Sequence, residues 1–321
     1  MIETVERGFA FTEAPFAQCH ASTLARTPTG WAVAWFGGTH EKHPDVGIWL
    51  SRREGNGPWS APERVAKIDR AAHWNPVLFA APSGILHLWF KTGPEIPHWK
   101  TFTQASRDDG KTWGAARELV PGDDSGGRGP VKNKPICLSD GAWLAGASSE
   151  QDTWEAFVDR SEDGGRTWTR SENFDRTALG KKHGCIQPTL WESAPGVVHA
   201  LVRSSCGFLP RTDSFDGGRT WCPLHDSGLP NNNSGVDIAK LPDGTLALAC
   251  NPVSADWGAR SPLRVSLSYD NGKTWLDSID LKVEPGGEFS YPAIVSVGDD
   301  EVAVSYTWKR TRIGLWQGRV G

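Results

Sequence analysis

The sequence predicts an all-β fold, a six-bladed β-propeller whose ring is closed by the N-terminal segment. The main observation is an octet, Ser-x-Asp-x-Gly-x-Thr-Trp, that occurs four times, at residues 106–113, 161–168, 214–221 and 268–275. A degenerate fifth copy ends at Trp59, and the closing tryptophans recur about every 54 residues. Because the chain has 321 residues, this period predicts six units, each a small sheet of short strands.

The composition supports the same fold. The chain contains 36 Gly, 22 Pro and 17 Trp but only one Met, which is typical of many short strands joined by tight turns. The last unit, residues 288–321, lacks its octet, so we expect the N-terminal residues to supply its outer strand. The whole chain, 1–321, is therefore expected to form a single domain.

Each octet is interpreted as a turn rather than as a calcium site. The Asp side chain can accept hydrogen bonds from turn amides, the Gly can take a positive φ, and the Trp can pack between neighbouring sheets. The spacing lacks the further oxygen ligands of a calcium loop. The octets therefore predict structural turns.

Charge and hydropathy exclude several classes of protein. The 34 Lys+Arg and 38 Asp+Glu give a net charge of −4, too mild a balance for a nucleic-acid partner. No apolar run is long enough for a membrane helix, and the start of the chain is acidic where a secretory signal is basic, so we expect a cytoplasmic protein without a membrane partner. His40, Glu41 and His43 lack a further ligand at a suitable spacing, so no metal and no cofactor are expected. The oligomeric state stays open.

The repeat also predicts which side chains meet on the propeller axis. Aligning the six units on the turn that joins their first two strands gives one ring of residues before the turn: His20, Asn75, Lys134, Gln187, Gly235 and Tyr291. The same alignment gives a second ring after the turn: Gly37, Lys91, Ser148, Arg203, Asn251 and Thr307.

Three cations, Lys91, Lys134 and Arg203, fall in these rings. They favour an anionic ligand, because arginine binds a planar carboxylate through two parallel hydrogen bonds. The alternative is that they satisfy buried carbonyl groups or pair between blades. Four tryptophans are candidates for stacking on a sugar ring, with packing between blades as the alternative: Trp35, Trp74, Trp99 and Trp308.

The octets are Asp boxes, and the ring of six resembles the sialidase (neuraminidase) superfamily, in particular bacterial neuraminidase-like proteins, over nearly the whole chain. In that superfamily three arginines grip the substrate carboxylate. Arg203, in VHALVRSS, resembles the second of them, and Arg260, in ARSPLRVSLSYDNGKTW, resembles the third. His20, in CHASTL, stands where the first arginine is expected.

The same resemblance suggests the reacting groups. Tyr291, in FSYPAIV, resembles the nucleophilic tyrosine, and Asp45, in HPDVGIWLSR, resembles the aspartate that acts as acid and base. The glutamate that activates the tyrosine is replaced by Gln187, in CIQPTLW, and a neutral amide cannot accept the proton. Glu288, three residues before Tyr291, is an alternative base, although a strand would direct it to the opposite face.

These residues lead to three functional hypotheses. The first is a sialidase-like exo-glycosidase that cleaves a glycosidic bond at a terminal acidic sugar: Asp45 protonates the leaving oxygen while Tyr291, or a water positioned by His20, attacks the anomeric carbon. The second is a lyase that eliminates at a uronic acid, with Arg203 and Lys134 neutralising the carboxylate and His20 or Tyr291 removing the C5 proton. The third is a non-catalytic propeller that binds acidic glycans.

All three hypotheses imply an acidic oligosaccharide as partner. The catalytic candidates are Tyr291, Asp45 and His20. The candidates for substrate binding are Arg203, Arg260, Lys134, Lys91, Gln187, Asn75, Asn251 and Glu288.

Overall fold

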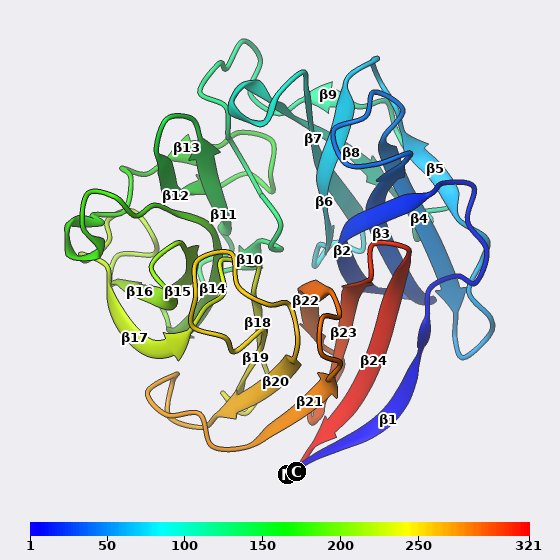
Figure 1. The fold of residues 1–321 in the computed structure, drawn as a ribbon. Helices are drawn as coiled ribbons and strands as arrows, with labels where there is room; N and C mark the ends of the chain where they lie inside the picture. The colour runs from blue at the N-terminus through cyan, green and yellow to red at the C-terminus, as the bar shows by residue number, and fades with distance from the viewer.

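Six four-stranded antiparallel sheets form a ring in the computed structural model, which describes residues 1–321 (Figure 1). Blade I contains β2 (Gln18–Thr27), β3 (Gly30–Gly38), β4 (Gly47–Glu54) and β5 (Glu63–Ala66). Blade II contains β6 (Ala72–Ala80), β7 (Leu86–Gly93), β8 (Lys100–Ser106) and β9 (Arg117–Glu118). Blade III contains β10 (Ile136–Cys137), β11 (Trp143–Glu150), β12 (Trp154–Ser161) and β13 (Thr169–Arg170).

The second half of the chain repeats this arrangement. Blade IV contains β14 (Cys185–Ala194), β15 (Val197–Ser204), β16 (Phe208–Ser214) and β17 (His225–Pro230). Blade V contains β18 (Asp237–Lys240), β19 (Leu246–Cys250), β20 (Leu263–Ser268) and β21 (Ser278–Lys282). Blade VI contains β22 (Phe289–Ser296), β23 (Glu301–Trp308), β24 (Arg312–Val320) and β1 (Ile2–Phe9). The predicted six-bladed propeller is confirmed.

Helix is confined to two single turns, η1 (Ile96–His98) and η2 (Thr177–Leu179). Neither turn is long or apolar enough to cross a lipid bilayer. The propeller is therefore built from strands and the loops between them.

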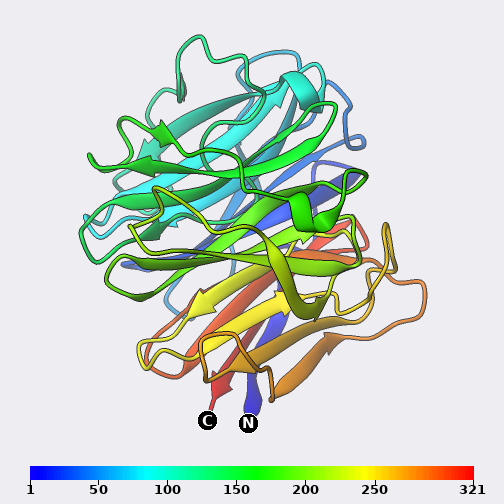
Figure 2. The same ribbon diagram turned by 90° about the vertical axis from the view of Figure 1, so that its left-hand side faces the viewer.

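The N-terminal strand closes the ring, as the missing sixth octet predicts. Strand β1 pairs antiparallel with β24, from Ile2 opposite Val320 to Phe9 opposite Gly314. The two chain ends lie side by side at the outer edge of blade VI (Figure 2), where the Met1 and Gly321 backbones are hydrogen-bonded to each other. Pairing with β1 hydrogen-bonds the outer edge of β24, which would otherwise expose a row of unpaired backbone groups.

The octets form the predicted turns between the third and fourth strands of blades II to V. In blade III the Asp163 carboxylate accepts hydrogen bonds from the amides of Arg166 and Thr167 and from the Thr167 hydroxyl. The Trp168 indole donates to the Gly165 carbonyl at 3.1 Å and is buried between sheets. The same Asp-to-Thr and Trp-to-Gly contacts recur in blades II and IV, which supports the structural interpretation.

The first strands carry a common irregularity near the axis. In blades I, II, IV and VI the ladder between the first and second strands is interrupted, and one residue there has a left-handed backbone: Ala21, Asn75, Gln187 and Tyr291, with φ of 54°, 38°, 58° and 53°. Four of the six blades thus share a β-bulge, a device that re-aims side chains. Three of the four residues precede proline.

The predicted rings are wrong in three blades, I, III and V. In blade V the left-handed residue is Asn233 rather than Gly235. In blade I the left-handed residue is Ala21 rather than His20, and His20 pairs with Phe36, so that the second ring passes through Phe36 instead of Gly37. The turn of blade I is tight, because Thr27 pairs with Gly30 across it. Residue positions counted from this turn are therefore shifted relative to those in the other blades. In blade III the left-handed residue is Lys132 rather than Lys134, because β10 has only two residues and the segment before it is irregular.

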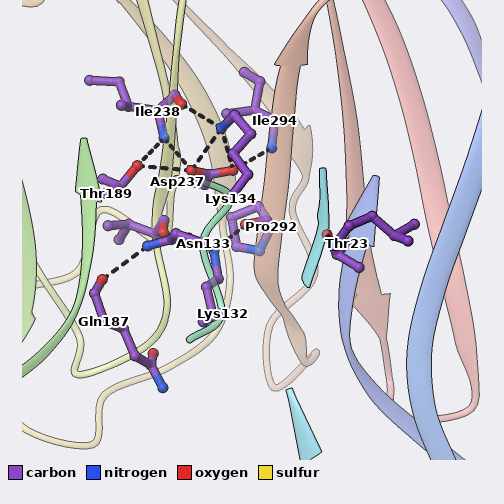
Figure 3. A network of polar contacts seen from close by, with 12 residues as sticks. Thr23, Lys132, Asn133, Lys134, Gln187, Thr189, Asp237, Ile238, Pro292 and Ile294 are labelled. Carbon is purple, nitrogen blue, oxygen red and sulfur yellow. Dashed lines mark hydrogen bonds and ion pairs between the residues drawn. The ribbon is translucent and has the colours of Figure 1, made fainter. Parts of the chain in front are cut away.

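Lys134 belongs to a buried network deeper along the axis (Figure 3). Its ammonium contacts both carboxylate oxygens of Asp237, at 3.0 and 3.1 Å, and donates to the Ile238 carbonyl. The Asp237 carboxylate also accepts hydrogen bonds from the Thr189 hydroxyl and from the amides of Ile238 and Ile294. One carboxylate therefore connects blades III, IV, V and VI, and Lys134 has a structural role instead of the expected ligand contact.

The first prediction concerns this carboxylate. We expect Asp237→Asn to lower the free energy of unfolding by about 3 kcal/mol, because it leaves the largely buried Lys134 ammonium without its counter-charge. Denaturant unfolding followed by tryptophan fluorescence measures the change. The double variant Lys134→Met/Asp237→Asn should be more stable than Asp237→Asn alone, and equal stability of the two would contradict the account.

Candidate functional site

The candidate site lies on the axis, at the mouth opposite the octets, where the first strands begin and the second strands end. Arg203, near the end of β15, is its central residue and is only 3% exposed. Its guanidinium donates to the Tyr291 hydroxyl at 2.6 Å, to the Gln187 side-chain oxygen at 3.2 Å and to the Asn233 side-chain oxygen at 2.9 Å. Three of the residues expected from the sequence, Arg203, Gln187 and Tyr291, therefore meet.

Arg203 has no carboxylate partner. One other arginine is buried, Arg160, and it is ion-paired with Asp140 at 2.7 Å. Arg203 instead contacts neutral groups. One of them, Asn233, donates a hydrogen bond from its side-chain amide to the Asp256 carboxylate at 2.7 Å. A buried cation without a direct counter-ion is costly, so this guanidinium is suited to bind an anion that reaches the mouth.

Two tryptophans flank Arg203. The guanidinium carbon lies 5.1 Å from the ring centre of Trp154 and 5.6 Å from that of Trp257. Trp257, on the loop between β19 and β20, is 64% exposed, and its ring is edge-on to Trp154. Trp154 and Trp257 therefore lie beside Arg203, where a sugar ring could stack. Of the tryptophans suggested by the sequence, Trp35, Trp74 and Trp99 are buried in the core.

His20 packs directly against Tyr291. The two ring centres are 4.3 Å apart, and the His20 Nδ1 atom is 2.9 Å from the Thr307 hydroxyl oxygen, which also accepts the Ala21 amide. Burial lowers the pKa of His20 well below its usual value, and the positive charges of Arg310, Arg260 and Arg203 lower it further. His20 is therefore a neutral imidazole at physiological pH.

Two more arginines stand beside this pair. Arg260 lies with its guanidinium carbon 5.5 Å from the Tyr291 ring centre, and Arg310 reaches the same mouth from the hairpin between β23 and β24. Both donate to one oxygen of Glu288 at 2.9 Å, and Arg310 also pairs with Glu41. Glu288 precedes β22 and holds the two guanidinium groups in place; it is an anchor for them and not a free base.

Arg310 is one of the functional candidates that sequence reasoning missed. It lies outside every repeat position, on a turn that only the folded chain brings to His20. The available signal was the basic run Lys309, Arg310 and Arg312 at a predicted strand turn. Glu41 was considered only as a metal ligand, yet it lines a small hollow with His20 and Arg310.

Asp45 is on the loop between β3 and β4 but does not join this cluster. Its side chain is 47% exposed and accepts hydrogen bonds from the amide and hydroxyl of Thr39, with His43 at 2.8 Å. Burial opposes the effect, but these contacts lower the pKa of Asp45 to about 2. The carboxyl is therefore ionised at physiological pH.

Three other residues expected to bind the ligand make no hydrogen bond to Arg203. Lys91 is fully buried and donates to the Thr101 hydroxyl and the Arg128 carbonyl, so it satisfies the backbone, as the alternative hypothesis states. Asn251 donates to the carbonyls of Pro262 and Phe289. Asn75 is buried on β6 and occupies the first-ring position predicted for blade II.

Lys132 fills the axis beneath the mouth. Its ammonium donates to the Asn133 side chain and to the carbonyls of Val236 and Pro292. Figure 3 shows Lys132 next to Asn133 and Pro292. Gly235 makes room for it, because a Cβ there would lie 2.8 Å from the Lys132 Cε atom. Burial lowers the pKa of Lys132 to about 7, although Asp237 opposes the shift.

Comparison with known proteins agrees with this geometry. A family model described as BNR repeat-like domain matches residues 31–304. The chain belongs to the BNR repeat-like domain family. No curated protein matches the sequence. Solved structures do resemble this BNR repeat-like protein, and several of them are sialidases, so the predicted resemblance to the sialidase superfamily is confirmed.

Three of these structures show the extent of the likeness. A protein of unknown function from Dyadobacter fermentans has 16% identity and a TM-score of 0.81, with 100% of this chain and 99% of that one covered. The Hadza microbial sialidase Hz136 has 16% identity and a TM-score of 0.80, with 94% and 66% covered. An intramolecular trans-sialidase from Ruminococcus gnavus, in complex with oseltamivir carboxylate, has 12% identity and a TM-score of 0.76, with 98% and 96% covered. At these identities the BNR repeat-like protein shares their fold.

The buried lysines generate the second prediction. Burial lowers the pKa of both Lys91 and Lys132 to about 7, far below the value of a lysine in the unfolded chain. Between pH 7 and pH 9 the unfolded chain therefore binds more protons, so the free energy of unfolding should rise with pH. Above about pH 9 the raised pKa of the buried cysteines acts in the opposite direction.

Urea unfolding at a series of pH values measures this slope. In Lys132→Met the rise between pH 7 and pH 9 should be roughly halved, because Lys91 remains. The exposed Lys181→Met serves as control and should keep the full slope. A slope that is unchanged in Lys132→Met would contradict the assignment.

Proposed function

We propose that this protein is a sialidase-like exo-glycosidase that cleaves a glycosidic bond at a terminal acidic sugar. The observation that carries the proposal is the buried guanidinium of Arg203, which lacks a carboxylate partner and touches the hydroxyl of Tyr291. A sugar carboxylate bound by Arg203 would place its ring next to that hydroxyl. Anion binding and a nucleophile thus coincide at one point.

The balance of charges at the mouth favours an anionic ligand. The two positive charges of Arg260 and Arg310 are balanced by the two negative charges of Glu288 and Glu41. The unpaired charge of Arg203 therefore makes the net charge at the centre of the mouth positive. A neutral sugar would leave that charge buried and unsatisfied, which costs free energy. The complex of the Ruminococcus gnavus trans-sialidase with a carboxylate ligand supports an acidic ligand for this fold.

His20 replaces the base that the chain lacks at Gln187. The neutral imidazole lies against the Tyr291 ring, and in the tautomer with its proton on Nδ1 the Nε2 atom is free to accept the phenol proton. The oxygen of Tyr291 then bonds to the anomeric carbon as the glycosidic bond breaks. A water later supplies the hydroxyl that releases the sugar, and Tyr291 recovers its proton from His20.

A uronate lyase is a second candidate, supported by the same pairing of His20 with Tyr291. In that reaction one of them removes the C5 proton, the other assists departure of the leaving oxygen, and Arg203 neutralises the carboxylate. Lys134, the other cation expected to help, is committed to Asp237. Elimination yields an unsaturated sugar, whereas hydrolysis adds one water to the products.

The third prediction is the direct test of function. We expect incubation with sialosides and uronate-terminated oligosaccharides to give products heavier in total by one water, without the ultraviolet absorbance of an unsaturated sugar. Mass spectrometry and absorbance measure both. Tyr291→Phe should lose turnover while keeping ligand binding, because only the nucleophilic oxygen is removed. Unsaturated products would show that the protein is a lyase and not a hydrolase. Binding without turnover would show that it is a non-catalytic, glycan-binding propeller.

The fourth prediction separates binding from folding at Arg203. We expect Arg203→Met to weaken binding of an acidic saccharide by about 100-fold or more, because charged hydrogen bonds to a carboxylate are lost. The melting temperature should stay close to that of the wild type, because an uncompensated buried charge is removed. Calorimetry and thermal unfolding measure the two effects. Retained binding together with a large loss of stability would make Arg203 a structural residue.

A further inference from the structure

A further carboxyl group, that of Glu150, lies at the mouth, and the reaction described so far does not use it. Glu150 is the last residue of β11 and pairs with Trp154, the first residue of β12. The ring of Trp154 lies 5.1 Å from the Arg203 guanidinium carbon. The hairpin of blade III therefore brings a carboxyl group to the wall of the site.

The direction of the Glu150 side chain follows from the strand. Ser148, two residues earlier, points toward blade IV, where its hydroxyl accepts the Gln187 amide at 3.4 Å. Because alternate residues of a strand point to the same face, Glu150 points the same way as Ser148, one step closer to the mouth. Gln187 in turn contacts Arg203, so Glu150 is on the side of the anion-binding residues.

The Glu150 carboxyl is unusual in its surroundings. Its Oε1 atom is buried and has no hydrogen-bond partner, whereas buried carboxyl oxygens normally have one. Burial raises the pKa of Glu150; Arg203 and Lys91 oppose this shift, and Glu41 adds to it. Glu150 is therefore a carboxyl group that retains its proton more readily than an ordinary glutamate and has a buried oxygen without a hydrogen-bond partner.

Asp45 offers the contrasting environment. Its oxygens are occupied by Thr39 and His43, and its pKa is lowered to about 2. A general acid must carry a proton near the working pH, and it gives that proton to an oxygen within hydrogen-bond reach. Two carboxyl groups in such different environments are typical of a site in which one is ionised and the other is the acid.

We propose that Glu150, rather than Asp45, gives the proton to the leaving oxygen of the acidic saccharide. This inference rests on the proposed glycosidase function. As the glycosidic bond breaks, its electron pair stays on the leaving oxygen, which takes the Glu150 proton and departs as an alcohol, while the Tyr291 oxygen bonds to the anomeric carbon and its proton passes to His20. In the second step water gives one proton to Glu150 and its hydroxyl to the sugar, and His20 returns the proton to Tyr291.

Ligand binding should reinforce this role. The carboxylate of the sugar would neutralise Arg203, the positive charge that lowers the pKa of Glu150 most. Binding of the anion and protonation of Glu150 then favour each other by linkage. The substrate therefore helps to protonate the acid that its own cleavage requires.

The fifth prediction tests Glu150 with two leaving groups on the same acidic sugar. In Glu150→Gln we expect kcat for an oligosaccharide, whose leaving alcohol needs a proton, to fall by about 100-fold or more. For the nitrophenyl glycoside, whose leaving group departs as an anion, kcat should change by less than about tenfold. With the oligosaccharide we expect the kcat of the wild type to fall at high pH, as Glu150 loses its proton, and we expect this fall to be absent in Glu150→Gln.

Two matched variants complete the experiment. Asp152→Asn, an exposed carboxylate on the same hairpin, should leave both rates unchanged. Asp45→Asn should show no dependence on the leaving group; if it shows that dependence and Glu150→Gln does not, Asp45 is the acid and the inference fails. A wild type that hydrolyses neither substrate would instead overturn the proposed function, and the proton donor with it.

Discussion

The arrangement at the mouth depends on one backbone constraint, the bulge at the start of the first strands. Left-handed residues at Ala21, Asn75, Gln187 and Tyr291 interrupt the ladder at one level of four blades. Such a conformation costs about 1–3 kcal/mol at a residue other than glycine, and it persists only where the surrounding structure holds it. Here the holding structure is the packed ring of six sheets, closed by β1 on β24. Rigid closure thus allows Tyr291 and Gln187 to face Arg203.

Electrostatic balance gives the mouth its character. Arg260 and Arg310 share Glu288, and Glu41 completes that group, so most of the charge is cancelled within the protein. Arg203 is left with neutral partners, and the burial of His20 among cations keeps its imidazole uncharged. One cation without a counter-ion, one neutral imidazole and one phenol meet in this centre, which is the arrangement that the proposed cleavage of an acidic sugar requires.

Much of this could be predicted from the sequence, because the repeat carries the fold. Octets at a constant period specify six blades, and the missing sixth octet indicates closure by the N-terminal strand. The meeting of Arg203, Gln187 and Tyr291 follows from the same alignment. Lys134 was misplaced because counting from turns assumes equal strands, and blade III breaks that assumption before β10. Arg310, Trp257 and Glu150 lie outside the inner-strand positions that the alignment brings to the axis, so only the fold shows their neighbours.

The closure of the ring also determines how the molecule would respond to a pulling force. The backbones of Met1 and Gly321 are hydrogen-bonded to each other, and β1 runs antiparallel to β24 from that point. Tension applied between the two ends would load the β1–β24 ladder in the unzipping direction, so its hydrogen bonds would break one after another instead of together. The propeller is thus mechanically weakest at its own seam. Once β1 had separated, the load would reach the mouth, because the chain continues from β1 into β2, which carries His20, and the Cys19 amide is hydrogen-bonded to the Arg310 carbonyl.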